Sequence, residues 1–417
     1  MLSTKRLHAL VAAFVFSACA APAPHESPNI VVPDRNDDTG LPEPTTKDDE
    51  EKKSEPPPTT PLPPSVADAL ALARVARDGE VHTILVLGSS EQAIEGIDLT
   101  LSLGERSTYP LDVVASKGFA AIANVATTGK RESFARSTVL VPIDEVSNHV
   151  CTGINYADHS AETGQADVQP FLFPKVAKPT SFETTIERRD GELLDYEVEL
   201  CVAFGKTIAT EADLADNPMG FVVCNDVSER ATQILNLDNA NQATGKGYTD
   251  AKSRPGFLPL GPWVVVPKDP NAYLAKSTIA LYRNGKRKQS ESPTKMIWKI
   301  DRIVKEALAL GKDARFELGG KSLALLPTGK IERGTLLMTG TPAGVILQAP
   351  TFQYKAAKAA EWIGTGAFLS MDVETFVKQE FVADLREARE FLLPGDAIEA
   401  EATGLGKLRY TITGSKD

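Results

Sequence analysis

The segment formed by residues 194–202 constrains the fold of this chain more than any other, because its residue types alternate with a period of two. That period is typical of a β-strand, whose successive side chains point to opposite faces. Two sets of side chains would then lie on opposite faces, Leu194, Tyr196, Val198, Leu200 and Val202 on one and Asp195, Glu197, Glu199 and Cys201 on the other. The sequence therefore predicts a strand that gathers three acidic side chains on a single face.

Carboxylates stacked in this way repel one another unless water, basic side chains or a metal ion lies against them. Hard divalent cations such as Mg²⁺ prefer oxygen ligands. A second apolar segment, residues 221–224, is followed by Asn225 and Asp226, which places another carboxylate at the end of a predicted strand, where functional sites collect. Simpler interpretations remain open: the acidic face is solvated, and Asp226 forms a turn or caps a helix that starts near residues 228–230.

Histidine and glutamate occur three residues apart at His159 and Glu162, so they would be neighbours on a helix. A carboxylate beside an imidazole fixes its tautomer and makes it a better general base. The alternative is a surface ion pair on a short helix. Five histidines occur in the chain, and those that could transfer protons in a folded site are His82, His149 and His159.

Two further segments have the composition of site loops. Lys252 precedes a Pro/Gly-rich corner at residues 257–262, and residues 334–345 form a predicted strand that enters a tight Gly/Pro turn around Thr341. Backbone N–H groups of such a turn, together with the Thr341 hydroxyl, can hold an anion. Each segment also has a purely structural interpretation, as a surface lysine and as an ordinary turn.

The N-terminal residues do not resemble part of a folded domain. Lys5 and Arg6 precede an apolar segment, residues 9–16, of about half the length needed to span a bilayer. The string that ends at Cys19 resembles a bacterial lipobox, although Phe16 replaces the usual small aliphatic residue. The sequence therefore predicts a signal peptide at residues 1–21 with lipid attached to Cys19, and a location in the bacterial cell envelope, periplasm or outer membrane. The alternative is secretory cleavage near residues 18–21, which would release a soluble protein.

Residues 22–64 are rich in Pro, Asp, Glu, Lys and Thr, a composition that cannot bury enough apolar area to fold. We expect a disordered tether that reaches on the order of 100 Å. The net charge of −11 disfavours nucleic acid and anionic membranes as partners, so the expected membrane contact is the lipid anchor alone.

The cysteines Cys19, Cys151, Cys201 and Cys224 match no zinc or redox motif. Whether Cys201 and Cys224 pair is left open.

The remaining chain divides by its patterning into two parts. Residues 65–148 form a predicted accessory domain, with a helix after Ser65 indicated by the spacing of Val66, Leu70 and Ala73, and a strand at residues 83–87. Residues 149–417 form the predicted catalytic domain, in which short β-branched segments and Gly/Pro turns indicate a β-rich α+β fold. An insertion at about residues 348–392 contains Trp362 and a predicted helix near residues 373–391.

Taken together in chain order, these motifs resemble the signature blocks of the fumarylacetoacetate hydrolase family. Seven segments carry the resemblance over about 250 residues, namely Asn-Tyr-x-x-His-x-x-Glu at 155–162, Asp-Tyr-Glu-x-Glu-Leu at 195–200, Asn-Asp-Val-Ser-x-Arg at 225–230, Lys-Ser with Pro-Leu-Gly-Pro at 252–262, Thr-Gly-Thr-Pro-Ala-Gly at 339–344, Pro-Gly-Asp at 394–396 and Gly-Leu-Gly at 404–406. No single segment would suffice.

The resemblance implies a β-sandwich roll with a small N-terminal α/β extension, a bound Mg²⁺ or Mn²⁺, and a homodimer. It assigns roles to eight residues: the metal ligands Glu197, Glu199 and Asp226, the water-activating pair His159 and Glu162, the cation Lys252, and the substrate contacts Gln233 and Thr341.

The implied reaction is hydrolysis of a C–C bond in an acylpyruvate-like 2,4-dioxo acid, through a metal-chelated enolate. Without attack by water, the same site would decarboxylate or isomerise a 2-oxo diacid. From a different class, the chain could be a non-catalytic scaffold tethered to the cell surface, but a scaffold has no use for stacked acids. The sequence departs from the family at Arg254 and Pro255, where an aromatic residue and Asp are common, and Lys246 is a rival to Lys252.

Overall fold

The computed structural model describes residues 62–144, 148–165, 168–239, 241 and 244–414. The predicted signal peptide, residues 1–21 with Cys19, lies outside these residues, as does all but the last part of the predicted tether, residues 22–64. Within the described part of the chain, no helix has both the length and the apolar character that a membrane crossing requires.

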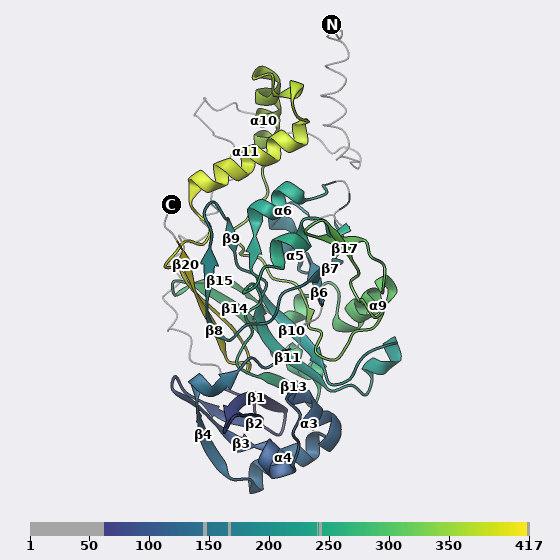
Figure 1. Ribbon diagram of the computed structural model, residues 1–417, viewed down its shortest axis with the longest axis vertical. Helices are drawn as coiled ribbons and strands as arrows, with labels where there is room; N and C mark the ends of the chain where they lie inside the picture. The colour runs from purple at the N-terminus through teal and green to yellow at the C-terminus, as the bar shows by residue number, and fades with distance from the viewer. Residues whose placement is uncertain (1–61, 145–147, 166–167, 240, 242–243, 415–417) are drawn as a thin grey trace, which may run out of the picture. The chain divides into compact units, whose positions relative to one another are not determined.

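The largest element of the described chain is an 11-stranded sheet in the order β4-β3-β2-β1-β13-β11-β10-β18-β6-β7, with β5 paired to β1 (Figure 1). Its pairs are antiparallel except for β18 with β6. Its strands are β1 Ala69–Arg77, β2 Glu80–Ser89, β3 Ala93–Asp98, β4 Arg131–Ala135, β5 Val139–Leu140, β6 His149–Gly153, β7 Phe171–Lys175, β10 Val198–Phe204, β11 Met219–Asn225, β13 Val264–Pro267 and β18 Leu337–Met338.

A second sheet of five strands has the order β15-β14-β19-β20-β8. Contacts of β14 with β10, and of β19 and β20 with β11, place the two sheets against each other as layers. Two short ladders, β9 with β12 and β16 with β17, complete the β structure of the described residues. The strands of these three sheets are β8 Glu183–Arg188, β14 Ile279–Arg283, β15 Lys286–Glu291, β19 Ala397–Ala402 and β20 Lys407–Gly414, then β9 Leu194–Asp195, β12 Ser228–Glu229, β16 Phe316–Leu318 and β17 Lys321–Leu323.

Helices connect the strands and carry several of the polar residues discussed below. The α-helices are α2 Leu99–Leu103, α3 Pro110–Lys117, α4 Phe119–Thr128, α5 Ala157–Glu162, α6 Arg230–Asn236, α7 Tyr248–Lys252, α8 Pro270–Ala275, α9 Ile300–Leu310, α10 Phe352–Gly364 and α11 Val373–Ala388. Short 3₁₀ turns are η1 Arg136–Thr138, η2 Glu211–Leu214, η4 Pro293–Lys295 and η5 Ala367–Leu369. The predicted β-rich α+β fold is confirmed.

Two tight turns fix the register of neighbouring strands. Asp78 and Gly79 join β1 to β2, and Asn284 and Gly285 join β14 to β15, each with φ between 52° and 83°. Two-residue hairpins of this kind need positive φ at both positions, which Asn-Gly and Asp-Gly accept at low cost. These dipeptides therefore determine which side chains of the paired strands face the core.

The region before residue 149 shows one wrong prediction and one confirmed one. The strand expected at residues 83–87 lies within β2, but the helix expected after Ser65 is wrong, because β1 occupies residues Ala69–Arg77. Ala69 to Val75 are all buried, so apolar residues stand on both faces of the strand and match a helical spacing by coincidence. β1 pairs with β13, which makes this region part of the large sheet. The domain boundaries at 65–148 and 149–417 remain predictions.

Candidate functional site

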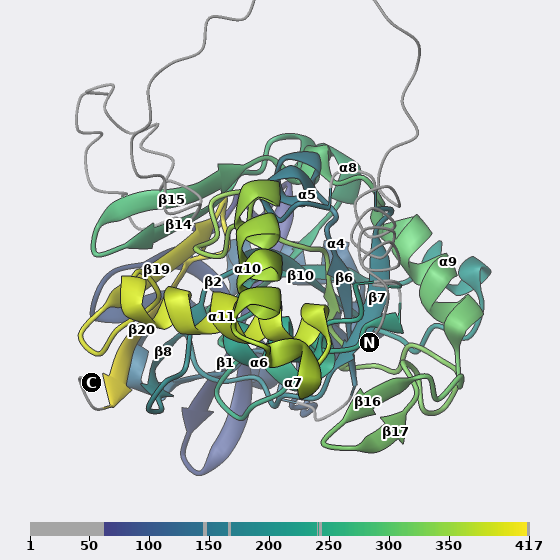
Figure 2. The same ribbon diagram turned by 90° about the horizontal axis from the view of Figure 1, so that it is seen from above.

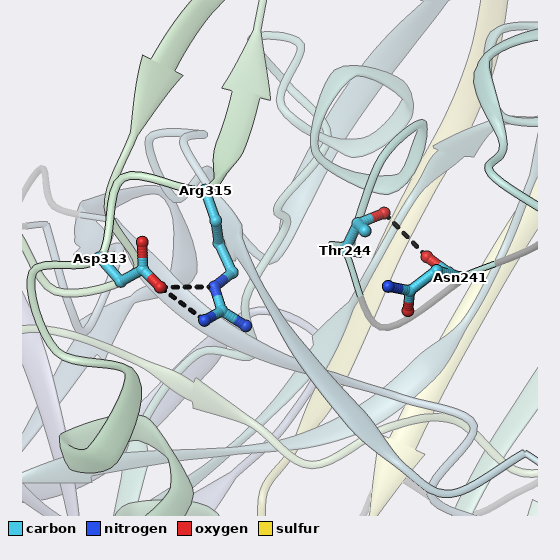
Figure 3. A pocket seen from close by; sticks show the side chains of 4 residues that line it. All are labelled: Asn241, Thr244, Asp313 and Arg315. Carbon is cyan, nitrogen blue, oxygen red and sulfur yellow. Dashed lines mark hydrogen bonds and ion pairs between the residues drawn. The ribbon is translucent and has the colours of Figure 1, made fainter.

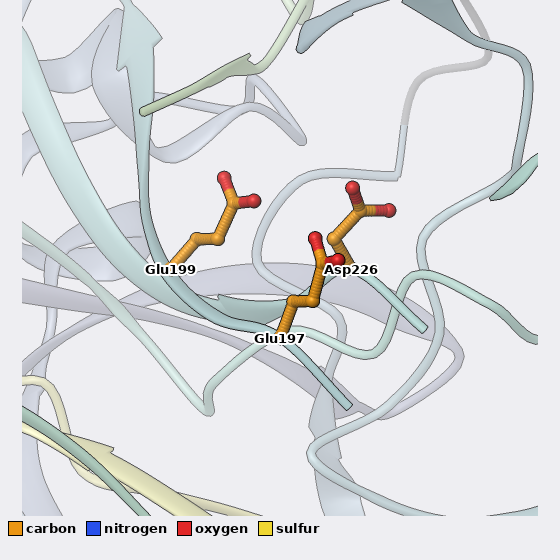
Figure 4. Close-up of side chains that lie close together, drawn as sticks. All are labelled: Glu197, Glu199 and Asp226. Carbon is orange, nitrogen blue, oxygen red and sulfur yellow. The ribbon is translucent and has the colours of Figure 1, made fainter. Parts of the chain in front are cut away.

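The carboxyl groups of Glu197, Glu199 and Asp226 converge in the interior of the described chain. Glu199 lies on β10, Glu197 immediately precedes that strand, and Asp226 immediately follows the adjacent strand β11. One oxygen from each carboxyl group lies within 4.8 Å of the others, and all three side chains point to the same side of the strands (Figure 4). Each residue is at most 6% exposed, so the alternative of a solvated strand face is excluded.

Two buried lysines neutralise part of this charge. Lys252, at the end of α7, donates hydrogen bonds to Glu197 Oε2 and Ser228 Oγ, each at 2.7 Å, and lies 2.9 Å from Asp226 Oδ2. Lys175, at the end of β7, lies 2.5 Å from Asp226 Oδ1. The rival Lys246 is exposed. Lys175 was not among the predicted site residues, although a lysine that ends the apolar segment Phe171–Lys175 is a recognisable signal for a buried charge.

Arg230, at the start of α6, is the third cation near the carboxylates. Its guanidinium donates to Glu197 Oε1 at 2.6 Å, to Asp195 Oδ2 at 2.8 Å and to Gln233 Oε1 at 2.7 Å. Burial alone would lower the pKa of Arg230, but Asp195 and Glu197 together raise it above its ordinary value. Asp195 thus pairs with Arg230 and lies outside the group of three carboxylates, although the alternation placed it on their face.

The electrostatic environments of Glu197 and Glu199 differ sharply. Burial alone would raise the pKa of Glu197, but Lys252 and Arg230 outweigh it and bring the pKa to about 2. Burial, followed by the charges of Asp226 and Glu197, raises the pKa of Glu199 well above its ordinary value. Within the described residues the Glu199 carboxylate accepts one hydrogen bond, from the Gly340 N–H at 2.9 Å, and has no lysine or arginine partner within 4 Å.

These donors fit a hard divalent cation. Three carboxylate oxygens close together are the ligand type that Mg²⁺ prefers, and Glu199 is the one carboxylate of the three that forms no ion pair with a described lysine or arginine. A cation among the three carboxyl groups would supply that balance and would stabilise Glu199 in its charged form. The donor set therefore suits a metal centre better than a network of ion pairs alone.

The predicted pair of His159 and Glu162 is formed on α5. His159 Nδ1 and Glu162 Oε1 are 2.8 Å apart, and the other oxygen of Glu162 accepts from the Gly344 N–H at 2.9 Å. Gly344 must be glycine, because its φ is +107° and a Cβ would lie 2.1 Å from the Lys288 carbonyl oxygen. His159 is buried. Glu162 holds Nδ1, which leaves Nε2 as the ring nitrogen that can accept a proton.

The remaining predicted site residues have protein partners of their own. Arg230 fixes the Gln233 carbonyl oxygen, so that the Gln233 amide NH₂ is the group that can donate to a substrate. The Thr341 hydroxyl donates to the Val198 carbonyl oxygen at 2.9 Å and accepts from the Gln289 amide at 2.8 Å. The N–H groups of the turn around Thr341 do bind carboxyl groups, namely the side chains of Glu199 and Glu162.

The other two candidate histidines have structural surroundings. His82 Nδ1 lies 2.7 Å from Asp98 Oδ2, on β2 and β3 of the N-terminal region. His149 is fully buried, its Nδ1 accepts from the Leu336 N–H at 3.1 Å, and burial together with the charge of Lys175 lowers its pKa to about 3. A neutral, enclosed imidazole of this kind does not transfer protons to a substrate near neutral pH.

The predicted insertion packs next to this site as two helices that cross (Figure 2). Val382 of α11 and Phe391 form a small apolar cluster with Leu193 and with Ala231 of α6, the helix that carries Arg230 and Gln233. The segment before α10 is also anchored at the site, because Asp195 accepts from the N–H groups of residues 346 and 347 at 3.0 and 3.1 Å. The helix predicted near residues 373–391 is observed and ends at Ala388.

Arg254, which departs from the family pattern, pairs with Glu192 and lies over the ring of Phe257.

A separate hollow of about 300 Å³ is lined by Asn241, Thr244, Asp313 and Arg315 (Figure 3). There Arg315 pairs with Asp313 at 2.5 Å, and Thr244 donates to the Asn241 carbonyl oxygen. Because these charges are already paired, the hollow does not compete with the carboxylate site as a functional centre.

Comparison with known proteins agrees with this fold. The family profile described as fumarylacetoacetate (FAA) hydrolase C-terminal matches residues 148–413, which is more than half of the chain. The chain therefore belongs to the fumarylacetoacetate hydrolase family. The family is enzymatic, and the names of the relatives include a hydrolase, an isomerase/decarboxylase and tautomerases.

Three curated relatives illustrate the range of similarity. Protein Rv2993c of Mycobacterium tuberculosis is 33% identical over 251 residues, 58% of this chain and 82% of that protein. A 4-hydroxyphenylacetate degradation bifunctional isomerase/decarboxylase of Salmonella dublin is 27% identical over 56% of this chain and 49% of its own length. A mitochondrial oxaloacetate tautomerase of Bos taurus is 29% identical over 50% of this chain and 60% of its own length.

Solved structures support the fold. The fumarylacetoacetate hydrolase of Exiguobacterium antarcticum superposes with a TM-score of 0.52 at 22% identity, over 83% of this chain and all of that one. A Mycobacterium smegmatis protein gives a TM-score of 0.53 at 21% identity over the same shares. At this level of identity the likeness establishes the architecture and not the substrate.

Proposed function

We propose that this protein is a divalent-metal-dependent hydrolase that cleaves a C–C bond in an acylpyruvate-like 2,4-dioxo acid. The observation that carries the proposal is the convergence of three buried carboxylates beside a buried lysine, with a histidine–glutamate pair on the adjoining helix α5. In the proposed site Glu197, Glu199 and Asp226 hold Mg²⁺ or Mn²⁺. The bound cation would polarise the oxygens of the 2-oxo acid and lower the energy of the enolate that cleavage releases.

His159 is the proposed general base. Its Nε2 takes a proton from water, and the hydroxide attacks the distal carbonyl of the substrate. The bond between that carbonyl carbon and the neighbouring methylene carbon then breaks, which gives a carboxylic acid and the enolate of pyruvate. Glu162 keeps the proton on Nδ1 and stabilises the charged imidazole that forms. The described position of this pair on α5, anchored to Gly344, supports the assignment.

Lys252 and Gln233 are proposed to stabilise negative charge on the substrate. Lys252 places a fixed positive charge beside Glu197 and Asp226, as in an oxyanion hole. All three of its N–H donors point to protein oxygens, so one must be exchanged for a substrate oxygen. Gln233 offers its amide NH₂, and Thr341 is the second proposed substrate contact.

Decarboxylation or isomerisation of a 2-oxo diacid is the second candidate. The Salmonella dublin and Bos taurus relatives, named as an isomerase/decarboxylase and an oxaloacetate tautomerase, favour it. Both reactions need enolate stabilisation but no attacking water, so that the metal site and Lys252 would suffice without His159. A non-catalytic scaffold fits less well, because three carboxylates buried at one point cost folding free energy unless they bind something.

The experiment that separates these candidates is a substrate panel with and without metal. We expect purified protein with Mg²⁺ to convert acylpyruvates to pyruvate and one equivalent of carboxylic acid, measured by loss of enol absorbance and by product analysis, and to lose this activity with a chelator. Release of CO₂ from oxaloacetate, without acylpyruvate cleavage, would support the decarboxylase. Inactivity on the whole panel, with no metal bound, would support the scaffold.

We further propose that the protein is exported, that Cys19 carries the lipid anchor, and that the folded part forms a homodimer. The string of residues 16–19 and the polar composition of residues 22–64 support the anchor. In a bacterial host, Cys19→Ser should move the protein from the membrane fraction to the soluble fraction on cell fractionation, whereas Cys151→Ser should leave it in place. Recovery of both variants in the membrane fraction would contradict the anchor.

A further inference from the structure

Two cysteines flank the metal ligand Glu199 in the sheet. β10 and β11 are antiparallel, with Glu199 opposite Cys224 and Cys201 opposite Val222, and the Asp226 N–H donates to the Glu197 carbonyl oxygen at 2.8 Å. Residues two apart on a strand share a face, so Cys201 lies on the face of Glu199, one position further along β10. Cys224 lies directly across from Glu199 on the neighbouring strand.

These cysteines form a disulfide with their Cα atoms 5.9 Å apart. Both are fully buried, and Cys224 Sγ lies 3.6 Å from the carbonyl oxygen of Glu199. The sequence alone left this pairing open. The disulfide therefore links β10 to β11, the two strands that carry or adjoin the three carboxylates, next to Glu199 in the sheet.

Glu199 needs this support more than the other two proposed ligands. Lys252 and Arg230 hold the Glu197 carboxylate, and two lysines hold that of Asp226, whereas the Glu199 carboxylate receives a hydrogen bond only from the Gly340 N–H within the described residues. Because one oxygen of each carboxyl group lies within 4.8 Å of the others, an ionised Glu199 is repelled by Asp226 and Glu197 unless a cation lies among them. The backbone of β10 must resist that force.

We propose that the disulfide between Cys201 and Cys224 is a positioning element of the metal centre, which holds Glu199 in place so that the oxidised protein binds its divalent cation more tightly than the reduced protein. The inference rests on the proposed metal site. The bond forms when the two thiols lose two protons and two electrons to a disulfide-bonded donor, which is reduced to two thiols. It would couple metal affinity to an oxidising compartment such as the one expected for an exported chain.

The test is a Mn²⁺ titration of the full protein, oxidised and after reduction, with bound Mn²⁺ followed by electron paramagnetic resonance. Thiol counting and peptide mass spectrometry establish the disulfide, and near-ultraviolet circular dichroism establishes the fold. We expect the Kd for Mn²⁺ to rise about tenfold on reduction, as it does when supporting groups of metal ligands are lost. The Cys201→Ala/Cys224→Ala double variant should match the reduced protein. The control, Cys151→Ala, removes a buried thiol from β6 without touching the disulfide and should bind like wild type.

Equal affinity of the oxidised and reduced folded proteins would overturn the proposal, as would the absence of the disulfide from the oxidised protein. If both the reduced protein and the double variant unfold, the disulfide serves the fold and not the site, and the proposal is again wrong. These results differ from a failure of the proposed function, in which even the oxidised wild type would bind no Mn²⁺ or cleave no substrate.

Discussion

Replacing Glu199 with Gln is expected to abolish metal binding while the fold persists. The substitution removes the one proposed ligand that forms no ion pair with a described lysine or arginine, and the amide oxygen can still accept from the Gly340 N–H. We expect no saturation by Mn²⁺ at concentrations about 100-fold above the wild-type Kd. The metal-free variant should be more stable to urea than metal-free wild type by about 1–3 kcal/mol, because folding without metal forces the wild-type Glu199 carboxyl either to take up a proton or to stay charged without an ion-pair partner. Isothermal titration calorimetry and urea unfolding measure both effects.

Glu401→Gln is the matched control for this prediction. Glu401 is a partly buried carboxyl whose pKa is likewise raised by burial, but it lies on β19 of the five-stranded sheet. Its variant should bind Mn²⁺ like the wild type. Normal Mn²⁺ affinity in the Glu199 variant would show that the ligands have been assigned to the wrong carboxylates.

Replacing His159 with Asn is expected to remove hydrolysis and spare metal binding. The Asn amide can still donate to Glu162, but it offers no basic nitrogen at the position of Nε2. Loss of a general base lowers kcat for acylpyruvate cleavage by about 10³-fold, while the Kd for Mn²⁺ should stay within about twofold of wild type. If the site also tautomerises oxaloacetate, that activity should survive, because it needs no attacking water. Steady-state kinetics on both substrates measure the separation.

Asp158→Asn serves as the control, since Asp158 is an exposed acid on the same helix, next to His159. Its kcat should be unchanged. Acylpyruvate cleavage at the wild-type rate in the His159 variant would mean that another group activates water.

Local patterning pointed to the acidic strand face and to a carboxylate at the end of a second strand, but it left a solvated face open. The resemblance to the family then selected Glu197, Glu199 and Asp226 as ligands, and the structure brings these three together. It also gave roles to His159, Glu162 and Lys252, which spacing alone had left open and which lie around the same point. The order of the motifs supplied the architecture, which local propensity alone could not.

The parts that the sequence missed depend on contacts between distant segments. Lys175 donates a hydrogen bond to Asp226, which is 51 residues away in the sequence. Gln289 accepts a hydrogen bond from the Val198 N–H, and these two residues are 91 positions apart. This second contact lies where the predicted strand breaks, between β9 and β10, and the break takes Asp195 away from the ligand group. The local periodicity of a sequence carries no information about such contacts between distant residues. The wrong helix after Ser65 has a similar origin, because β1 is buried on both faces only in the context of its neighbouring strands.

The most direct test of this account is a crystal structure of the oxidised protein soaked in Mn²⁺ and measured at a wavelength where manganese scatters anomalously. We expect one strong anomalous peak, at about 2.1 Å from a carboxylate oxygen of each of Glu197, Glu199 and Asp226. A structure in which these three carboxyl groups point apart, or in which manganese binds elsewhere and leaves them empty, would contradict it.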